Sequence, residues 1–238
     1  MANVIVFGTG QIAELVSYFL DNDSEHEIVG YTVNEAYISE PTFLGKPVVA
    51  WENLESKFPP SDYYLFCPLS YRNLNQERRD KYQEGKNKGY RFITYIHSSS
   101  LVSTKKVGEN CLILERCTLQ PYSSIGDNVV LWTSTHIGHH SKVGDHCFIA
   151  GTGGIAGNTT IGEGTFIGGY SGVGDNVIVG KYCLIGINSI VVRDLEDETV
   201  YATKRHQRVK PGIARQKRFG ALLTAKRGRH MKQRESNQ

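Results

Sequence analysis

Histidine side chains gather in one short stretch of the chain, and the imidazole group is well suited to moving protons near neutral pH. Residues 135–141 read THIGHHS, and His146 follows shortly after. A positioned imidazole can take the proton from an attacking amine or hydroxyl group. The alternative is that each histidine is an ordinary solvated residue. The position of each histidine in its secondary-structure element distinguishes between these interpretations.

Those elements are set by a repeat of six residues that runs from Val107 to Glu196 without an insertion. The first residue of each hexad is aliphatic, and the fifth is small or slender in fourteen of fifteen hexads. A period of six fits neither a helix nor a continuous strand. It predicts a coil of short strands separated by corners, with the first and fifth residues pointing inward.

The second and fifth residues of the hexad carry two further predictions. Glycine is second in nine of the fifteen hexads, and we expect it there because a corner needs a permissive backbone. Four of the five cysteines are fifth in their hexads, which predicts small core residues rather than disulfides or nucleophiles. These are Cys111, Cys117, Cys147 and Cys183.

Residues 3–96 read as alternating strands and helices. A short apolar strand at residues 4–7 precedes apolar residues at helical spacing from Ile12 to Phe19. Further strands are predicted at 28–33, 63–67 and 90–96, with a polar helix over 72–88. This alternation predicts a parallel sheet with right-handed crossovers.

The first strand-to-helix turn, residues 8–13, has the sequence GTGQIA. Its glycines allow an anion to approach the backbone, and the start of the helix supplies amide donors. The alternative is a tight turn without a ligand. The second predicted strand ends at Val33 without an acidic residue to hold the ribose of a dinucleotide. The turn therefore favours the diphosphate of a nucleotide-sugar.

The hexads resemble those of the hexapeptide-repeat acyltransferases, which wind a left-handed parallel β-helix with three hexads, about 18 residues, per coil. Residues 4–13, 30–34, 43–48 and 96–100 resemble the sialic-acid O-acetyltransferase type, in which a small Rossmann-like domain binds nucleotide-sugar. The resemblance implies an α/β domain at 1–97, a β-helix of about five coils at 98–202 and a basic extension at 203–238. Residues 18 apart would stack in one column.

The resemblance also implies a set of site residues. The catalytic base of the family aligns with His139, and His140 takes the place where the family usually has Asp or Glu. Gly157 lies one coil above His139 and could hold a thioester carbonyl through its amide. The implied CoA-binding residues are Gly157, Gly168, Gly169, Gly186 and Ile187, and the implied nucleotide-sugar residues are Gly8, Gly10, Gln11 and Asn34.

The implied activity is transfer of an acyl group, most simply acetyl from acetyl-CoA, to an amino or hydroxyl group of a nucleotide-linked sugar. Such a reaction would serve lipopolysaccharide or other glycan synthesis. The family is homotrimeric, and no acyl-enzyme is expected because no Ser or Cys is paired with His139. Zinc is not expected, because no histidine between His97 and His136 could supply the upstream ligand used by related carbonic anhydrases.

Charge and targeting signals leave one alternative function open. The start of the chain does not read as a signal peptide, and no run of 18 apolar residues exists, so a cytoplasmic protein without a membrane span is expected. Residues 203–238 hold twelve Lys or Arg and one acidic residue, Glu235. This tail would suit a β-helix scaffold that binds nucleic acid or an anionic membrane. It lacks regular aromatic residues, so nucleic-acid binding is not the leading prediction.

Overall fold

A computed structural model describes residues 1–203 of the 238-residue chain, and residues 204–238 lie outside the described part. The N-terminal elements are β1 (Asn3–Phe7), α1 (Gln11–Asp23), β2 (Glu27–Val33), η1 (Glu35–Tyr37), β3 (Thr42–Phe43), β4 (Lys46–Ala50), η2 (Trp51–Asn53), α2 (Leu54–Lys57), β5 (Tyr64–Phe66), α3 (Gln76–Asn87) and β6 (Arg91–Phe92). They form one sheet of order β3-β4-β2-β1-β5-β6, in which only the β3–β4 pair is antiparallel. The predicted parallel sheet is therefore confirmed, and it has the strand order of a Rossmann-like fold.

Alternate residues of β1 pack into two apolar layers, one on each face of the sheet. Val4 and Val6 pack with the apolar face of α1, whereas Ile5 and Phe7 pack with Trp51 and its neighbours. All four residues are buried, as expected for a central parallel strand covered on both faces. The strand therefore ends in a fixed position, directly before the GTGQIA turn.

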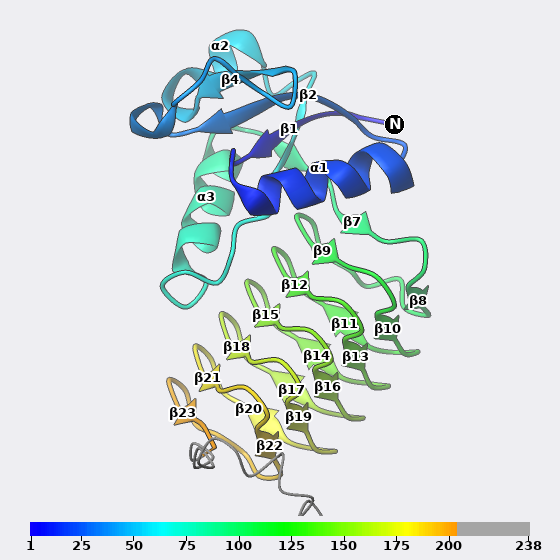
Figure 1. Ribbon diagram of the computed structural model, residues 1–238. Helices are drawn as coiled ribbons and strands as arrows, with labels where there is room; N and C mark the ends of the chain where they lie inside the picture. The colour runs from blue at the N-terminus through cyan, green and yellow to red at the C-terminus, as the bar shows by residue number, and fades with distance from the viewer. Residues whose placement is uncertain (204–238) are drawn as a thin grey trace, which may run out of the picture. The chain divides into compact units, whose positions relative to one another are not determined.

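The rest of the described chain is a stack of short parallel strands, three per coil, arranged in three sheets (Figure 1). We name each sheet after an early strand. The β9 sheet holds β7 (Tyr95–Ile96), β9 (Leu112–Ile113), β12 (Val130–Leu131), β15 (Phe148–Ile149), β18 (Phe166–Ile167), β21 (Leu184–Ile185) and β23 (Val200–Tyr201). The β10 sheet holds β8 (Leu101–Val102), β10 (Thr118–Leu119), β13 (His136–Ile137), β16 (Gly154–Ile155), β19 (Gly172–Val173) and β22 (Ile190–Val191). The β11 sheet holds β11 (Ser124–Ile125), β14 (Lys142–Val143), β17 (Thr160–Ile161) and β20 (Ile178–Val179).

The predicted hexad registry is confirmed. Residues 18 apart pair across neighbouring coils, as His136 does with Gly154 and Ile137 with Ile155. The aliphatic first residues from Ile113 to Val191 and the four fifth-position cysteines are all buried in one continuous core. The aliphatic first residues and the small fifth residues therefore fill the interior of the coil together.

The predicted reason for the second-position glycines is wrong. The left-handed backbone conformation occurs at the fourth residue of the hexad, for example at His140 with φ of 61° and at Asn158 with φ of 56°. A methyl group on Gly138 would instead lie 2.6 Å from the carbonyl carbon of Ala156, in the next coil. Glycine is required at that second position because neighbouring backbones approach too closely for a side chain.

Each coil turns at three corners, which we name for later use. The histidine corner joins the β10 sheet to the β11 sheet and includes residues 120–123, 138–141 and 156–159. The clamp corner joins the β11 sheet to the β9 sheet and includes 108–111, 126–129, 144–147 and 162–165. The glycine corner joins the β9 sheet to the β10 sheet and includes 132–135, 150–153, 168–171 and 186–189.

The N-terminal sheet packs on the coil through one face only. Leu112, Val130 and Phe148 project outward from the β9 sheet and share a core with residues of β1 and α1, such as Val16. The predicted strand at 90–96 is divided by this junction: β6 belongs to the N-terminal sheet, whereas β7 pairs with β9 of the coil. Within residues 1–203, no helix has the length and hydropathy needed to cross a lipid bilayer.

Candidate active site

His139 and His140 are exposed third and fourth residues at the histidine corner, as their hexad positions predict. Their Nδ1 atoms lie 3.1 Å apart, and their rings meet nearly at right angles, with an interplanar angle of 83°. The backbone N–H of His139 donates to Gln120 Oε1 at 2.9 Å. The His140 ring stacks on Tyr122 of the preceding coil, with 4.7 Å between centroids. The pair is therefore held on several sides while remaining open to solvent.

Gly157 lies in the next coil, directly against the His139 ring, as the 18-residue spacing predicts. A methyl group at Gly157 would lie 2.6 Å from His139 Cε1 and 2.7 Å from Nε2. The Gly157 amide is already occupied, because its N–H donates to Asp175 Oδ1 at 2.9 Å. A thioester carbonyl can reach this N–H only if the Asp175 carboxylate moves away. Asp175 lies 18 residues beyond Gly157 and was not among the predicted site residues.

The other implied CoA residues lie at a different corner. Gly168, Gly169, Gly186 and Ile187 belong to the glycine corner, which is separated from His139 by the width of the β10 sheet. Neighbouring coils pack closely on Gly168 and Gly186, whereas the Ile187 side chain is exposed. One chain therefore brings Gly157 to His139 but does not bring the remaining four residues to that histidine.

The implied nucleotide-sugar residues surround two adjoining cavities at the carboxyl end of β1. Gly8, Gly10 and Gln11 line a cavity of about 480 Å³, and Gly8 and Asn34 line its neighbour of about 450 Å³. These cavities lie where strand order reverses, between β1 and β5, which is the usual ligand crevice of an open parallel sheet. Gly10 caps α1 without a side-chain hydrogen bond, so the first amides of a 13-residue helix face the cavity.

The charged residues that line these cavities, Arg72, Glu77, Asp80, Lys81 and Glu84, were not predicted, and neither was Glu52 beside Asn34. Arg72 lines both cavities and forms no salt bridge with another residue in the range 1–203. Glu52 accepts a hydrogen bond from Asn34 Nδ2 at 2.8 Å, and this bond lowers the pKa of the Glu52 carboxyl group. A carboxylate therefore does lie near the end of β2, although it comes from a later segment.

Arg72 belongs to the loop that follows β5. In a sheet of this order that loop must lie beside the GTGQIA turn, so its charged residues could have been predicted as part of the site.

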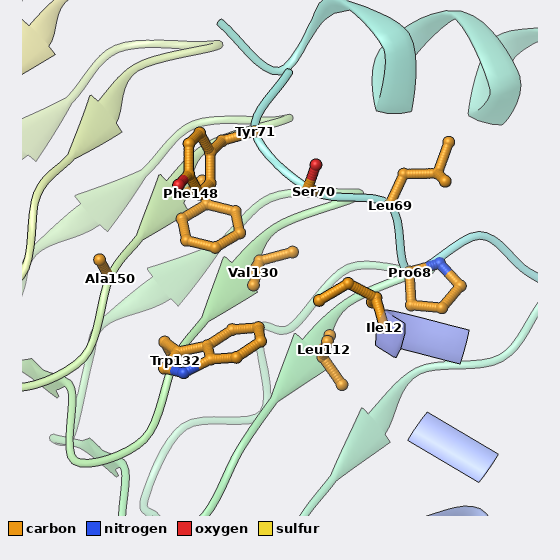
Figure 2. A pocket seen from close by; sticks show the side chains of 10 residues that line it. All are labelled: Ile12, Pro68, Leu69, Ser70, Tyr71, Leu112, Val130, Trp132, Phe148 and Ala150. Atoms are coloured by element: carbon orange, nitrogen blue, oxygen red, sulfur yellow. The ribbon is translucent and has the colours of Figure 1, made fainter. Parts of the chain in front are cut away.

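An apolar cavity of about 240 Å³ adjoins the crevice and reaches the coil (Figure 2). Ile12 and Pro68 approach it from the N-terminal domain, and Trp132 and Phe148 project into it from the coil. Trp132 and Ala150 follow strands of the β9 sheet and lead toward the glycine corner. A ligand held by its diphosphate at the GTGQIA turn would extend its other end in this direction.

Arg78 joins the crevice to the clamp corner and is fully buried. Its guanidinium group donates to the carbonyl oxygens of Ser70 at 3.2 Å, His146 at 2.7 Å and Cys147 at 3.1 Å. Burial lowers the pKa of Arg78 to about 10, which leaves it charged at neutral pH. No carboxylate within residues 1–203 forms a salt bridge with Arg78, so its charge is stabilised by backbone carbonyl oxygens and by Asn75 Oδ1.

The remaining histidines and the cysteines have surroundings that differ from those of His139. His146 is covered by α3, and burial lowers the pKa of its imidazole. His136 is a half-buried outward residue of β13. All five cysteines are buried and free, and burial raises the pKa of the Cys111 and Cys147 thiols to about 12. In the described range 1–203, no group of three or more His, Cys, Asp or Glu is placed to hold a metal ion.

Comparisons with known proteins agree with this architecture. Residues 158–193 match the family described as bacterial transferase hexapeptide (six repeats). No curated protein sequence matches the chain. The acetyltransferase domain of PglB from Neisseria gonorrhoeae is 20% identical with a TM-score of 0.74, over 88% of this chain and 100% of that one.

Two other solved structures have the same fold. PerB from Caulobacter crescentus, in complex with CoA and GDP-perosamine, is 25% identical with a TM-score of 0.70, over 83% of this chain and 92% of that one. WeeI from Acinetobacter baumannii is 17% identical with a TM-score of 0.65, over 83% and 95%. The narrower resemblance to the sialic-acid O-acetyltransferase type stays a prediction. Residues 158–193 therefore match the hexapeptide-repeat transferase family, and the chain has the fold of these three solved structures.

Proposed function

We propose that this protein transfers an acyl group, most simply acetyl, from acyl-CoA to an amino or hydroxyl group of a nucleotide-linked sugar. The observation that carries the proposal is the His139 ring, which is exposed at a coil corner, has its Nδ1 engaged by His140 and has its Cε1 and Nε2 atoms against Gly157 of the next coil. The solved PerB structure holds CoA and GDP-perosamine, which are a donor product and an acceptor of this chemical class. The product would enter lipopolysaccharide or other glycan synthesis.

In the proposed reaction, His139 Nε2 takes a proton from the acceptor as its nitrogen or oxygen attacks the thioester carbonyl. The carbon–sulfur bond then breaks, and the CoA thiolate leaves with the proton that His139 had taken. No protein nucleophile is needed, and the buried cysteines with raised thiol pKa values are unsuited to that role. The thioester carbonyl would displace Asp175 from the Gly157 amide, which then stabilises the developing oxyanion.

The proposed site needs a second copy of the chain. The N-terminal domain docks on the β9 sheet, and the histidine corner is the corner opposite that sheet. A sugar that extends from the crevice through the apolar cavity therefore approaches the glycine corner of its own chain, away from its own His139. We propose a homotrimer in which the histidine corner of one chain meets the glycine corner of the next, with CoA between them along Gly168, Gly169, Gly186 and Ile187.

The direct test mixes the protein with acetyl-CoA and a panel of UDP-, dTDP- and GDP-linked sugars, both amino and plain, and follows thiol release. We expect release with at least one nucleotide-linked sugar and none with the corresponding free sugars. Release that is independent of every acceptor, or absent with all of them, would overturn the proposal. Both co-substrates are cytoplasmic metabolites, which agrees with a cytoplasmic protein.

The shared site is tested by mixing two inactive chains with different affinity tags. His139→Ala removes the base, and Gly10→Glu places a negative charge in the crevice at a position with open space for a side chain. Mixed oligomers that carry both changes should regain a fraction of the activity, because one interface still joins a normal crevice to a normal histidine. Mixed oligomers without activity would contradict a site made by two chains.

A further inference from the structure

The imidazole rings of His139 and His140 contact each other directly. No carboxylate among residues 1–203 forms a hydrogen bond with either ring. The Nδ1–Nδ1 distance of 3.1 Å is a hydrogen-bond distance, so two neutral rings must share one proton, with one nitrogen donating and the other accepting. The direction of this bond fixes the tautomers of both rings. The pair is therefore a tautomer lock whose setting has chemical consequences.

Only one setting suits a base at His139. If His139 Nδ1 donates, the proton of that ring is on Nδ1, and Nε2 keeps a lone pair beside Gly157. If His140 Nδ1 donates instead, His139 carries its proton on Nε2 and cannot accept another there. A base that acts through Nε2 thus requires His140 to accept through Nδ1 and to carry its own proton on Nε2.

The surroundings hold His140 in place for this task. Its backbone is left-handed, with φ of 61°, and its N–H donates to the carbonyl oxygen of Pro121 at 3.3 Å. Its ring lies on Tyr122 at an interplanar angle of 30°. The nearby carboxylate of Asp175 is engaged by the Gly157 amide, and the nearby Gln120 amide oxygen accepts from the His139 backbone. No other acceptor for His139 Nδ1 is found among residues 1–203 except His140.

We infer that His140 is a positioning residue that accepts a hydrogen bond from His139 Nδ1 and so keeps His139 in the tautomer with a free Nε2. Tyr122 supports the lock by fixing the plane of the His140 ring. The inference rests on the proposed function of His139, and it adds how this chain orients a base with a neutral imidazole.

The corner backbone itself supplies well-matched variants. Fourth positions of other hexads hold asparagine, as at Asn158 and Asn176, or tyrosine, as at Tyr170 and Tyr182, all with left-handed φ. His140→Phe therefore keeps an aromatic ring on Tyr122 but removes the acceptor. His140→Asn keeps an acceptor, because the side-chain oxygen of asparagine occupies about the place of histidine Nδ1. His136→Phe is a control on the same coil, outside the proposed site.

The first measurement is the ring tautomer of His139, read from long-range ¹H–¹⁵N correlations of full-length protein at pH 8 and assigned with His139→Ala. We expect the Nδ1–H form in the unaltered protein and in His140→Asn, and a mixture or the Nε2–H form in His140→Phe. An Nε2–H ring in the unaltered protein would overturn the inference. This measurement needs no substrate, so it stands apart from any failure to find an acceptor.

The second measurement is turnover with the acceptor found in the thiol-release assay. We expect His140→Phe to lower kcat by roughly 10- to 100-fold with little change in KM, His140→Asn to restore most of that loss, and His136→Phe to behave as the unaltered protein. Thermal unfolding of each variant shows that the fold is kept. Equal kcat for His140→Phe and the unaltered protein would overturn the inference, as would equal losses in the Phe and Asn variants.

Discussion

His140 and His146 occupy the same position in consecutive hexads, but they belong to two corners with opposite surroundings. Both are left-handed, with φ of 61° and 62°, and both backbone N–H groups donate to a carbonyl oxygen of the preceding coil. His140 is exposed and contacts His139 and Tyr122. His146 is covered by α3, where its Nδ1 pairs with Asn128 Nδ2 at 2.9 Å.

The difference shows that the repeat fixes the backbone of a corner but not its chemistry. At the clamp corner, Tyr82 donates to Glu109 at 2.7 Å, and Asn75 Nδ2 donates to the carbonyl oxygen of Gly164 at 2.9 Å. These contacts come from α3 and its N-cap residue, and they engage polar groups of the corner. At the histidine corner no element from the described N-terminal domain covers the coil. Polar groups there remain available for a ligand.

Removal of the base should give the largest contrast between the two corners. We expect His139→Ala to lower kcat roughly 10²- to 10⁴-fold, because the acceptor then keeps its proton during attack, while the protein still folds. Steady-state kinetics and thermal unfolding check both parts. His136→Ala is the control and should retain normal turnover. An unchanged rate in His139→Ala would refute the role of this residue.

Loss of the buried guanidinium group of Arg78 should destabilise the clamp corner rather than lower activity at the histidine corner. We expect Arg78→Met to lower the free energy of unfolding by about 3–5 kcal/mol, because several buried carbonyl oxygens lose their donor together. Arg79→Met is a matched control, since Arg79 is partly exposed and contacts Tyr182 and Asp80 at the surface. The control should lose no more than about 1 kcal/mol. Denaturant unfolding that finds equal losses would show that Arg78 is no clamp.

A methyl group added at Gly157, against the His139 ring, should affect activity more than stability. Gly157→Ala would force the His139 ring away from its present place, and we expect a loss of roughly 10- to 100-fold in kcat. Gly154→Ala is the control in the same coil, because no atom lies within 4 Å of the added methyl group. Crystal structures or kinetics of both variants provide the check. If both variants turn over at the normal rate, contact between Gly157 and His139 is not needed.

Acid pH should destabilise the clamp corner through His146, and this is the smallest effect expected. Burial lowers the pKa of His146 in the folded state, while Asp145 and Glu163 favour its charged form and Arg78 and Arg79 oppose it. The unfolded chain therefore binds more protons below the ordinary pKa of 6.5, so stability is complete above that pH and is lost as pH falls. We expect His146→Asn to weaken this loss between pH 6.5 and 5, in urea unfolding compared with the unaltered protein. A steeper slope in His146→Asn than in the unaltered protein would contradict the assigned cause.

Much of the fold follows from the sequence because the repeat is a local signal that recurs at a fixed spacing. Ile137 and Ile155 had to pair, and His139 had to stand at a corner beneath the level of Gly157, once the coil length was known. The docking face carried a readable signal that was missed. Leu112, Val130 and Phe148 are apolar residues 18 apart at outward positions, and such a column needs a covering element.

The sequence by itself determined the coil, the inward column of apolar residues, the alternating N-terminal sheet and the corner positions of the histidines. These features depend on periodic side-chain burial, and the spacing of apolar residues along the sequence shows that period directly. Only the tertiary structure decided that Arg78 binds coil carbonyls, that Asp175 occupies the Gly157 amide, and that the crevice and His139 lie on opposite sides of one chain. Those arrangements bring together segments that share no sequence period. They are determined by how the segments pack in three dimensions.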